Sequence, residues 1–406
     1  MAILEFTFGN FRSFQTIQTL SMTAANISSK NKELDANHTF MATAQQKLLH
    51  SKAIYGANAS GKSNIIKALN AFVQIIKNSV IDNTAIQKHC QPFLLDGKGA
   101  QNPIFFQLMF IHQSVKYRYG FEVLDNKVFS EWLFIAQKGR EAAYFTADTE
   151  GLTIKNVFKY AKPFQNSHKI PNEIFNPTAL FLSSLSAVGN KTAKTVTAAI
   201  ANIVTILGAN DPMPQANLLA AINKQSSKDH ILELINAADI DITDLKVTND
   251  QLLTTRRQYD DQKNATQTIN ANFEEWESEG TKKMAALSPI LIAALANGHT
   301  LAIDGFELHL HPNLAHKIVS LFHSPETNPH HAQLIFVTHD TTLFKPDKLR
   351  RDQICLVEKD RYGSSTIIDL VEFKGVRNDA SFDKDYLQGR YGAIPFLNNM
   401  EQVFLS

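Results

Sequence analysis

The sequence predicts an α/β fold with a central sheet, because short apolar strands alternate with amphipathic helices around three loop motifs. The motifs follow predicted strands at residues 56–63, 303–312 and 338–340. Residues 93–160 contain aromatic-rich strands separated by turn residues, which predicts an antiparallel β-subdomain in the N-terminal part of the chain. Helical patterns predominate over residues 165–245, which we interpret as an inserted lid or arm.

This pattern divides the chain into three expected segments. Residues 1–164 should hold the first half of the core with the β-subdomain, residues 165–245 the helical insertion, and residues 246–406 the second half of the core. No heptad repeat is sustained anywhere in the chain, so a long coiled coil is not expected.

The individual elements follow in chain order. Residues 1–25 should form a strand and hairpin, and the polar residues 26–48 a loop or edge segment. A buried strand at 48–55 then leads through a Gly-rich loop into a helix at 64–80, where apolar residues recur at three and four. The later predicted elements are helices at 281–298 and 313–323 and strands at 299–304, 332–340, 353–359 and 365–373.

The composition is that of a globular, water-soluble chain. Hydrophobic residues make up 44% and charged residues 19% of the 406 positions, and the formal net charge is +1. Near-neutral charge gives no global attraction to nucleic acid or to a membrane surface. The two cysteines, Cys90 and Cys355, lie far apart, which fits a reducing compartment and excludes a disulfide scaffold. No apolar run is long enough to span a bilayer, so we expect a cytoplasmic protein without membrane contact.

The stretch GANASGKS, from Gly56 to Ser63, has the full spacing of a phosphate-binding loop between a predicted strand and a predicted helix. The glycines let backbone N–H groups turn toward phosphate oxygens, and the helix adds its positive N-terminal end. Lys62 would contact the β- and γ-phosphates, and the Ser63 hydroxyl would bind Mg²⁺. A chance Gly-rich turn is the alternative. The predicted nucleotide-binding residues here are Gly56, Asn58, Ala59, Ser60, Gly61, Lys62, Ser63 and Asn64.

Two later strands end in residues that could complete such a site. Asp304 ends the apolar run TLAID and is a candidate partner of the Mg²⁺ ion, although an aspartate there could also cap a helix. His339 ends the run LIFVTHD and could bond the γ-phosphate, although a lone histidine at a strand end is often structural.

A third motif precedes the helix that leads to Asp304. Ser278 and Gly280, in the order Ser-x-Gly at a helix start, form another potential anion-binding N-terminus. One chain cannot easily direct two helix ends at one γ-phosphate, but a head-to-tail dimer can. An ordinary serine helix cap is the alternative interpretation.

Together these residues carry a family resemblance. The arrangement resembles the ABC-type ATPase heads of the SMC and recombination-repair class. More closely, it is similar to the RloA-like ATPases of bacterial restriction and phage-defence loci, which are relatives of the OLD-family ATPases. The matching pieces, in order, are NFRSF, YGANASGKSN, YRYGFEV, ESEGTKK, IDGFELHLHP, VTHD, LRRDQICLVEKD and YLQGRYGAIP.

The resemblance implies a P-loop NTPase fold of ABC-ATPase head type, with ATP and Mg²⁺ held between the subunits of a homodimer or higher oligomer. It also implies a nuclease or toxin effector as partner in antiviral defence. By position, Arg12 would approach the nucleotide, Ser278 and Gly280 would be the signature pair, and His339 the switch histidine. His311 would lie in the inter-subunit loop. A glutamine on Mg²⁺ is also implied, for which Gln91 is the candidate.

Position 305 departs from the pattern of this family. A glutamate that activates water is expected directly after Asp304, and Gly305 stands there instead. Losing such a group removes roughly 10²–10⁴-fold in rate, while binding through Lys62 and Mg²⁺ should survive. Glu307 lies two residues further on and is the next carboxylate in the chain. The sequence therefore predicts ATP binding with weak or no hydrolysis, whether Gly305 is natural or a replacement.

Three functions remain open at this point. The first is an ATP-gated dimeric switch that controls an effector, and the second is an ATP-locked scaffold that restrains a toxin or nuclease. The third is an ATP-dependent DNA-repair or DNA-end-binding protein that acts without such a partner. The basic stretch KPDKLRRD, residues 345–352, could contact DNA or could simply be a solvated face.

Overall fold

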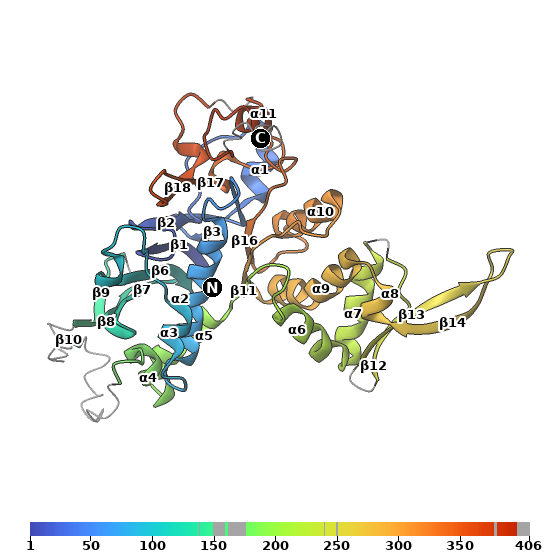
Figure 1. Cartoon of the computed structure of the whole chain (residues 1–406), viewed down its shortest axis with the longest axis horizontal. Helices are drawn as coiled ribbons and strands as arrows, with labels where there is room; N and C mark the ends of the chain where they lie inside the picture. Colours follow the sequence, from blue (N-terminus) through green and yellow to red (C-terminus); the bar gives the residue numbers. More distant parts are fainter. Residues whose placement is uncertain are drawn as a thin grey trace, which may run out of the picture.

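The computed structural model describes residues 1–137, 139–148, 159–160, 176–238, 240–248, 251–376 and 380–395. Parts of the predicted β-subdomain (149–158) and of the predicted helical insertion (165–175) lie outside the described residues. Two large sheets with helices between and around them form the body, and a smaller lobe projects from one side (Figure 1). None of the helices in the described ranges is long and apolar enough to cross a bilayer.

The core sheet has six strands in the order β11-β15-β16-β5-β17-β18. All neighbouring pairs are parallel except the last, in which β18 runs antiparallel to β17. The strands are β5 (Ser51–Gly56), β11 (Ile203–Ile206), β15 (Thr300–Ile303), β16 (Gln333–Val337), β17 (Ile354–Lys359) and β18 (Ser365–Asp369). Because parallel strands all end at one edge, the loops that follow β5, β15 and β16 meet there.

The second large sheet is antiparallel and has seven strands in the order β10-β9-β8-β7-β6-β1-β2. The strands are β1 (Ala2–Gly9), β2 (Gln18–Ser21), β6 (Ile104–His112), β7 (Val115–Leu124), β8 (Lys127–Ala136), β9 (Ala142–Asp148) and β10 (Lys159–Tyr160). The predicted α/β class and the N-terminal antiparallel sheet are thus confirmed.

Helix α2 (Lys62–Asn78) lies between the two sheets and joins them through one apolar cluster. Its apolar residues recur at three and four, so one continuous face is buried. Phe72 packs against Phe6 and Phe121 of the antiparallel sheet, with ring centroids 5.7 and 5.5 Å apart. The short helices α3 (Ala85–His89), α4 (Phe181–Ala187) and α5 (Lys191–Ala201) lie beside it.

The opposite face of the core sheet is covered by α9 (Glu279–Asn297), α10 (Pro312–His323) and α11 (Phe382–Leu387). Successive residues of β5 point to opposite faces, so Ile54 joins the cluster around α2 while Tyr55 joins this second cluster. The core sheet is therefore buried on both faces, as a parallel sheet requires.

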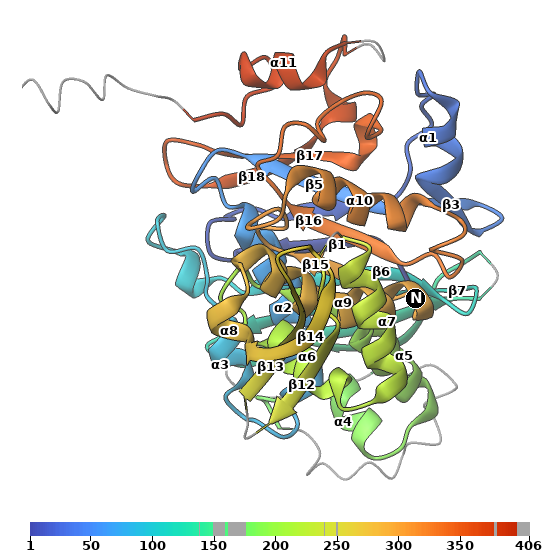
Figure 2. The ribbon, with the colours of Figure 1, turned by 90° about the vertical axis from the view of Figure 1, so that its right-hand side faces the viewer.

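The projecting lobe has its own apolar cluster. It consists of α6 (Met213–Ile222), α7 (Gln225–Asn236), β12 (Asp244–Thr248), β13 (Gln251–Tyr259), β14 (Ala265–Asn272) and α8 (Phe273–Trp276). In Figure 2 this lobe faces the viewer, in front of the core sheet. Helix α9 belongs to both units, because Ala285 packs in the lobe and Leu291 packs against the core sheet.

The structure corrects three details of the predicted organisation. Residues 203–206, inside the expected helical insertion, form core strand β11, so this segment is not a separate helical unit. The expected boundary after residue 245 falls within β12, and the lobe continues across it. Residues 26–48, expected to form a loop or edge segment, contain α1 (Lys32–Asn37), β3 (Thr39–Thr43) and the start of β4 (Gln46–Leu49).

A histidine cluster, in which His38, His50 and His323 are buried and His331 is exposed, packs the β3–β4 hairpin against the core sheet. The His38 and His323 rings stack with centroids 3.6 Å apart, and His50 Nε2 lies 3.3 Å from His331 Nδ1. Burial lowers the pKa of His38 and of His50 to about 4, and it lowers the pKa of His323 as well. His38 Nδ1 lies 2.8 Å from Gln353 Oε1.

These histidines predict that stability falls as the pH is lowered from about 6.5 toward 4. In that window the unfolded chain binds protons that the buried neutral rings do not, so the free energy of unfolding decreases. For His38 alone the loss is on the order of 3 kcal/mol. Urea unfolding of His38→Asn at a series of pH values should show a shallower decrease, because the amide can donate to Gln353 without titrating. His330→Asn, at an exposed position, is the control, and an unchanged slope in His38→Asn would contradict the prediction.

Candidate functional site

The phosphate loop lies between β5 and α2, with Gly61 at the N-terminal cap of the helix. Gly61 has a φ of 110°, and a Cβ there would lie 2.5 Å from Ser365 Oγ and 2.7 Å from Ser13 Oγ. Only glycine fits this position. The backbone can therefore form the tight curve that presents its N–H groups at the start of α2.

Neighbouring segments hold the loop in place from two sides. Ser365 Oγ donates to the Ser60 carbonyl at 2.7 Å, and Asn64 Nδ2 donates to Ser13 Oγ at 2.8 Å. Asn58 and Ala59 are exposed at the tip. The loop is thus fixed by β18 and by the segment after β1, while its tip stays open to a ligand.

The two residues that begin α2 have the contacts a nucleotide site needs. Lys62 Nζ donates to the Gly56 and Ala57 carbonyls at 2.9 and 2.8 Å. Burial lowers the pKa of Lys62, and the charges of Asp304 and Glu307 oppose that shift. Ser63 Oγ donates to Asp304 Oδ1 at 2.9 Å, which joins residues 241 positions apart. A hydroxyl and a carboxylate at this spacing are suitable oxygen ligands for Mg²⁺.

The turn after β15 brings Glu307 into the same site. Gly305 has a φ of 64°, so the chain reverses directly after Asp304. Glu307 Oε1 then accepts the backbone N–H of His339 at 2.7 Å. The other oxygen, Oε2, is buried and has no hydrogen-bond partner in the described part of the chain. The sequence identified Glu307 only as the next carboxylate after Gly305, and its contact with His339 depends on this turn.

His339 follows β16, and its electrostatic neighbours are the residues just named. Burial lowers its pKa, and the Lys62 charge lowers it further, while Glu307 and Asp304 raise it. The structure therefore brings Lys62, Asp304, Glu307 and His339 together at the carboxyl edge of the core sheet. A neutral imidazole is the expected form near pH 7.

Ser278 and Gly280 lie at the N-terminus of α9, on the lobe side of the core. Ser278 Oγ accepts the Thr281 N–H at 3.2 Å, which is the geometry of a serine cap. A Cβ at Gly280 would lie 2.7 Å from the His309 carbonyl, so this helix start is packed against the loop that follows Asp304. The predicted contact of this pair with a second subunit's nucleotide stays a prediction.

Arg12 and Gln91 are next to each other. The Arg12 N–H donates to the Gln91 carbonyl at 2.8 Å, and the following residue, Ser13, contacts the phosphate loop. Arg12 Nε is buried and has no hydrogen-bond partner among the described residues. Arg12 thus lies near the loop, and Gln91 lies beside Arg12. The predicted contacts of Arg12 with the nucleotide and of Gln91 with Mg²⁺ stay predictions.

The loop after β11, residues 207–211, also lies beside Asp304, and the sequence analysis did not identify it as part of the site. A Cβ at Gly208 would lie 3.9 Å from Asp304 Oδ2. The signal in the sequence is weak: a short β-branched run, IVTI, followed by the turn residues GANDP. This short run lies inside a longer helical pattern, so it is easily assigned to a helix.

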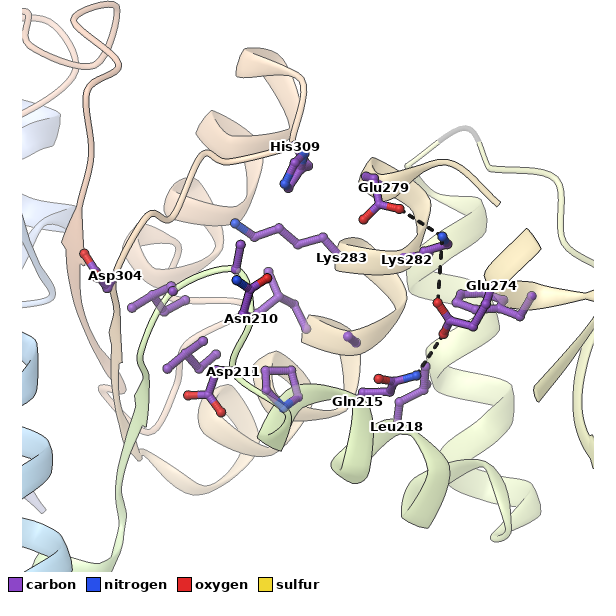
Figure 3. A pocket seen from close by; sticks show the side chains of 18 residues that line it. Asn210, Asp211, Gln215, Leu218, Glu274, Glu279, Lys282, Lys283, Asp304 and His309 are labelled. Atoms are coloured by element: carbon purple, nitrogen blue, oxygen red, sulfur yellow. Dashed lines mark hydrogen bonds and ion pairs between the residues drawn. The ribbon is translucent and has the colours of Figure 1, made fainter. Parts of the chain in front are cut away.

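A cavity of about 210 Å³ opens between this loop, α6, α9 and Asp304 (Figure 3). Lys283 extends into it from α9 and donates to the Gly305 carbonyl at 2.8 Å. Burial lowers the pKa of Lys283 to about 8. Lys282, its neighbour, pairs with Glu274 and Glu279. Lys283 therefore links the helix that starts at Ser278 directly to the turn after Asp304.

Residues 53–345 match the model of a protein family described as "AAA domain, putative AbiEii toxin, Type IV TA system". The match covers more than half of the chain and includes the phosphate loop, Asp304 and His339. The chain belongs to this family. It is thus an AAA domain whose matched region contains the phosphate-binding loop.

Among solved structures, the AAA domain is similar to an SMC head domain from Thermotoga maritima, at 12% identity and a TM-score of 0.41. That alignment covers 91% of this chain and 99% of the other. It is also similar to an SMC head bound to the C-winged helix domain of ScpA, at 15% identity and a TM-score of 0.44, covering 95% and 100%. No curated protein sequence matches the chain.

The turn after Asp304 yields a stability prediction. Gly305→Ala should lower the free energy of unfolding by about 1–2 kcal/mol, because a side chain at φ 64° is strained. Its Cβ would also lie 2.5 Å from Leu308 Cδ1. Gly97→Ala is the matched control, since Gly97 has a φ of 70° with nothing within 4 Å. Denaturant unfolding should show a larger loss for Gly305→Ala, and Leu308→Ala should relieve the difference; equal losses in the two glycine variants would contradict the steric argument.

Proposed function

We propose that this protein is an ATP-binding, nucleotide-gated switch that closes as a dimer around ATP and Mg²⁺. The observation that carries the proposal is the meeting of three loops at one edge of the core sheet. Lys62 and Ser63 from the first, Asp304 from the second and His339 from the third come together there. Each supplies a group that recognises a different part of a nucleotide triphosphate.

Each of these groups has a definite role in binding. The N–H groups at the start of α2 and the Lys62 ammonium neutralise the phosphate charge. Ser63 and Asp304, already in hydrogen-bond contact, would hold Mg²⁺, which supplies further neutralisation of the β- and γ-phosphates. His339 can donate a hydrogen bond to the γ-phosphate and so distinguish ATP from ADP. Gln91 as a further Mg²⁺ ligand is the least supported part of this set.

The N-terminus of α9 is the proposed contact with the second subunit. Ser278 is exposed there, and Trp276, two residues earlier, has 57% of its surface exposed. An exposed tryptophan beside a helix N-terminus is favourable for an interface that captures an anion. His311, the N-cap of α10, is the predicted inter-subunit loop residue.

The proposed biological role is antiviral defence in the cytoplasm, with ATP binding controlling a nuclease or toxin effector. The family description, which mentions a toxin and a toxin–antitoxin system, supports this role. The resemblance to RloA-like and OLD-related ATPases points in the same direction. Gly305 in place of glutamate favours a slow switch over a fast motor.

The basic stretch at residues 345–352 gives little support to the DNA-binding alternative. Arg350 is buried and pairs with Asp35 and Asp352. Arg351 donates to the Val376 carbonyl. Two of the four basic side chains are therefore engaged within the fold, Arg350 in ion pairs and Arg351 in a hydrogen bond to a carbonyl.

The first test measures ATP binding and turnover by the intact chain. Lys62→Ala, which lacks the ammonium group that contacts the phosphates, is the reference. The chain should bind MgATP, with affinity lost by at least 100-fold in Lys62→Ala, because binding depends on that charge. Turnover should be slow, roughly 10²–10⁴-fold below that of an ATPase with a full set of catalytic groups. Isothermal titration calorimetry and phosphate release measure the two quantities. Equal affinity in both chains would contradict the proposed site.

A second test concerns the dimer. Light scattering should show a mass increase with MgATP, and Ser278→Arg should abolish that increase without weakening ATP binding by the monomer. Asn190→Arg is the matched control, because Asn190 caps α5 through the Ala193 N–H in the same way, away from α9. Retention of the dimer in Ser278→Arg would argue against this interface. An ATP-dependent gain in duplex DNA binding without any dimer would favour the DNA-end alternative.

A further inference from the structure

We propose that Glu307 orients the water that attacks the γ-phosphate, so that the hydrolysis this chain performs depends on Glu307 and not on position 305. This inference rests on the proposed ATP-binding function. It assigns a catalytic residue three positions after Asp304, whereas the resemblance to known ATPases implies a catalytic carboxylate directly after Asp304.

The two oxygens of the Glu307 carboxylate have different surroundings. Oε1 accepts the His339 N–H at 2.7 Å, which fixes the direction of the group. Oε2 is buried and has no partner among the residues the structure describes. A buried carboxylate oxygen without a donor is costly, by about 1–3 kcal/mol or more. A bound water that donates to Oε2 removes that cost, and the held Oε1 keeps the acceptor pointing one way.

The position of Glu307 among charged groups supports the same role. Its carboxylate accepts the His339 N–H, and its charge opposes the lowering by burial of the pKa of Lys62 and of His339. Its charge opposes in the same way the lowering by burial of the pKa of Lys283, which contacts the Gly305 carbonyl. A carboxylate that contacts His339 and acts on the Lys62 ammonium is suitably placed to hold the water that attacks the γ-phosphate of a bound nucleotide.

Position 305 is poorly suited to this task. The backbone there has a φ of 64°, and the Cβ direction leads to Leu308 Cδ1, 2.5 Å away. A side chain at this position would therefore start out toward Leu308 and carry backbone strain. The same reversal of the chain is what brings Glu307 back to the His339 N–H. The turn that directs a side chain at position 305 toward Leu308 therefore also places Glu307 beside the His339 N–H.

The chemical step is a hydrolysis. The water oxygen forms a bond to the γ-phosphorus, and the bond from that phosphorus to the bridging oxygen of ADP breaks, with its electron pair leaving on ADP. Glu307 accepts the hydrogen bond and then the proton of the water, and passes the proton on to the released phosphate or to solvent. ATP and water give ADP, inorganic phosphate and a proton, and Glu307 is regenerated.

A purely structural role for Glu307 is the competing explanation, because the carboxylate also holds the His339 backbone. Glu307→Gln separates the two roles. The amide retains an oxygen for the His339 N–H, but its other terminus is a donor and cannot accept the water's proton. Glu307→Ala removes both functions. Glu326→Gln, at an exposed carboxylate between α10 and β16, is the control for the substitution itself.

The experiment compares phosphate release under single-turnover conditions, MgATP affinity by calorimetry, and thermal melting for the four chains, with Lys62→Ala as the reference. We expect Glu307→Gln to lose hydrolysis by about 10²-fold or more, down to the Lys62→Ala level, as removal of a general base does. Its ATP affinity should stay within threefold and its melting temperature within a few degrees. Glu307→Ala should lose hydrolysis and also melt lower.

The outcomes are distinguishable. Hydrolysis by Glu307→Gln within threefold of the unaltered chain would overturn the inference and leave the ATP-binding proposal standing. The same holds if the unaltered chain binds ATP but hydrolyses it no faster than Lys62→Ala. If the unaltered chain binds ATP no better than Lys62→Ala, the proposed function itself fails, and the assignment of Glu307 fails with it.

Discussion

The hydrogen bond between Ser63 and Asp304 is the contact on which the site depends. Ser63 lies in the first turn of α2, after the phosphate loop that follows β5, and Asp304 follows β15, two strands away across β16. The two side chains can meet only if these strands are parallel and end level with each other. Register in the core sheet, such as Val337 opposite Ile54 and Ile303 opposite Phe336, sets that level. The local geometry of the proposed Mg²⁺-binding pair is therefore a consequence of long-range strand pairing.

Helix α2 connects this edge to the rest of the fold. Its first turn carries Lys62 and Ser63, and its apolar face is clamped between the two sheets, with aromatic rings of the antiparallel sheet packed against it. Movement of the N-terminal end of α2 would displace Phe72 from a close-packed core, which is costly. The antiparallel sheet thus acts as a rigid support for the phosphate loop. Lys283 provides the corresponding link on the other side, from α9 to the Gly305 carbonyl.

Much of the fold and of the candidate site could be predicted from the sequence. The features that could not be predicted have one physical cause in common. The phosphate loop, Asp304 and His339 each follow a local strand pattern, and local spacing sufficed to predict where they lie in the fold. Strand β11 has only four residues and pairs with β15 almost a hundred positions later, so no local signal outweighed the helical pattern around it. The contact of Glu307 could not be predicted for a related reason. It depends on the reversal of the chain at Gly305, which is set by backbone dihedrals and not by residue spacing.

The same reversal explains how one segment can separate binding from turnover. Asp304 precedes the turn and is fixed by the sheet, so the proposed Mg²⁺ binding does not depend on the residues after the turn. Glu307 comes after the turn, and its direction is set by the His339 N–H, which belongs to the loop that would contact the γ-phosphate. A displacement of that loop by ATP would move the carboxylate with it. Water activation in this chain would then respond to the position of the loop that carries His339. This is a physical basis for a switch in which ATP hydrolysis is slower than ATP binding.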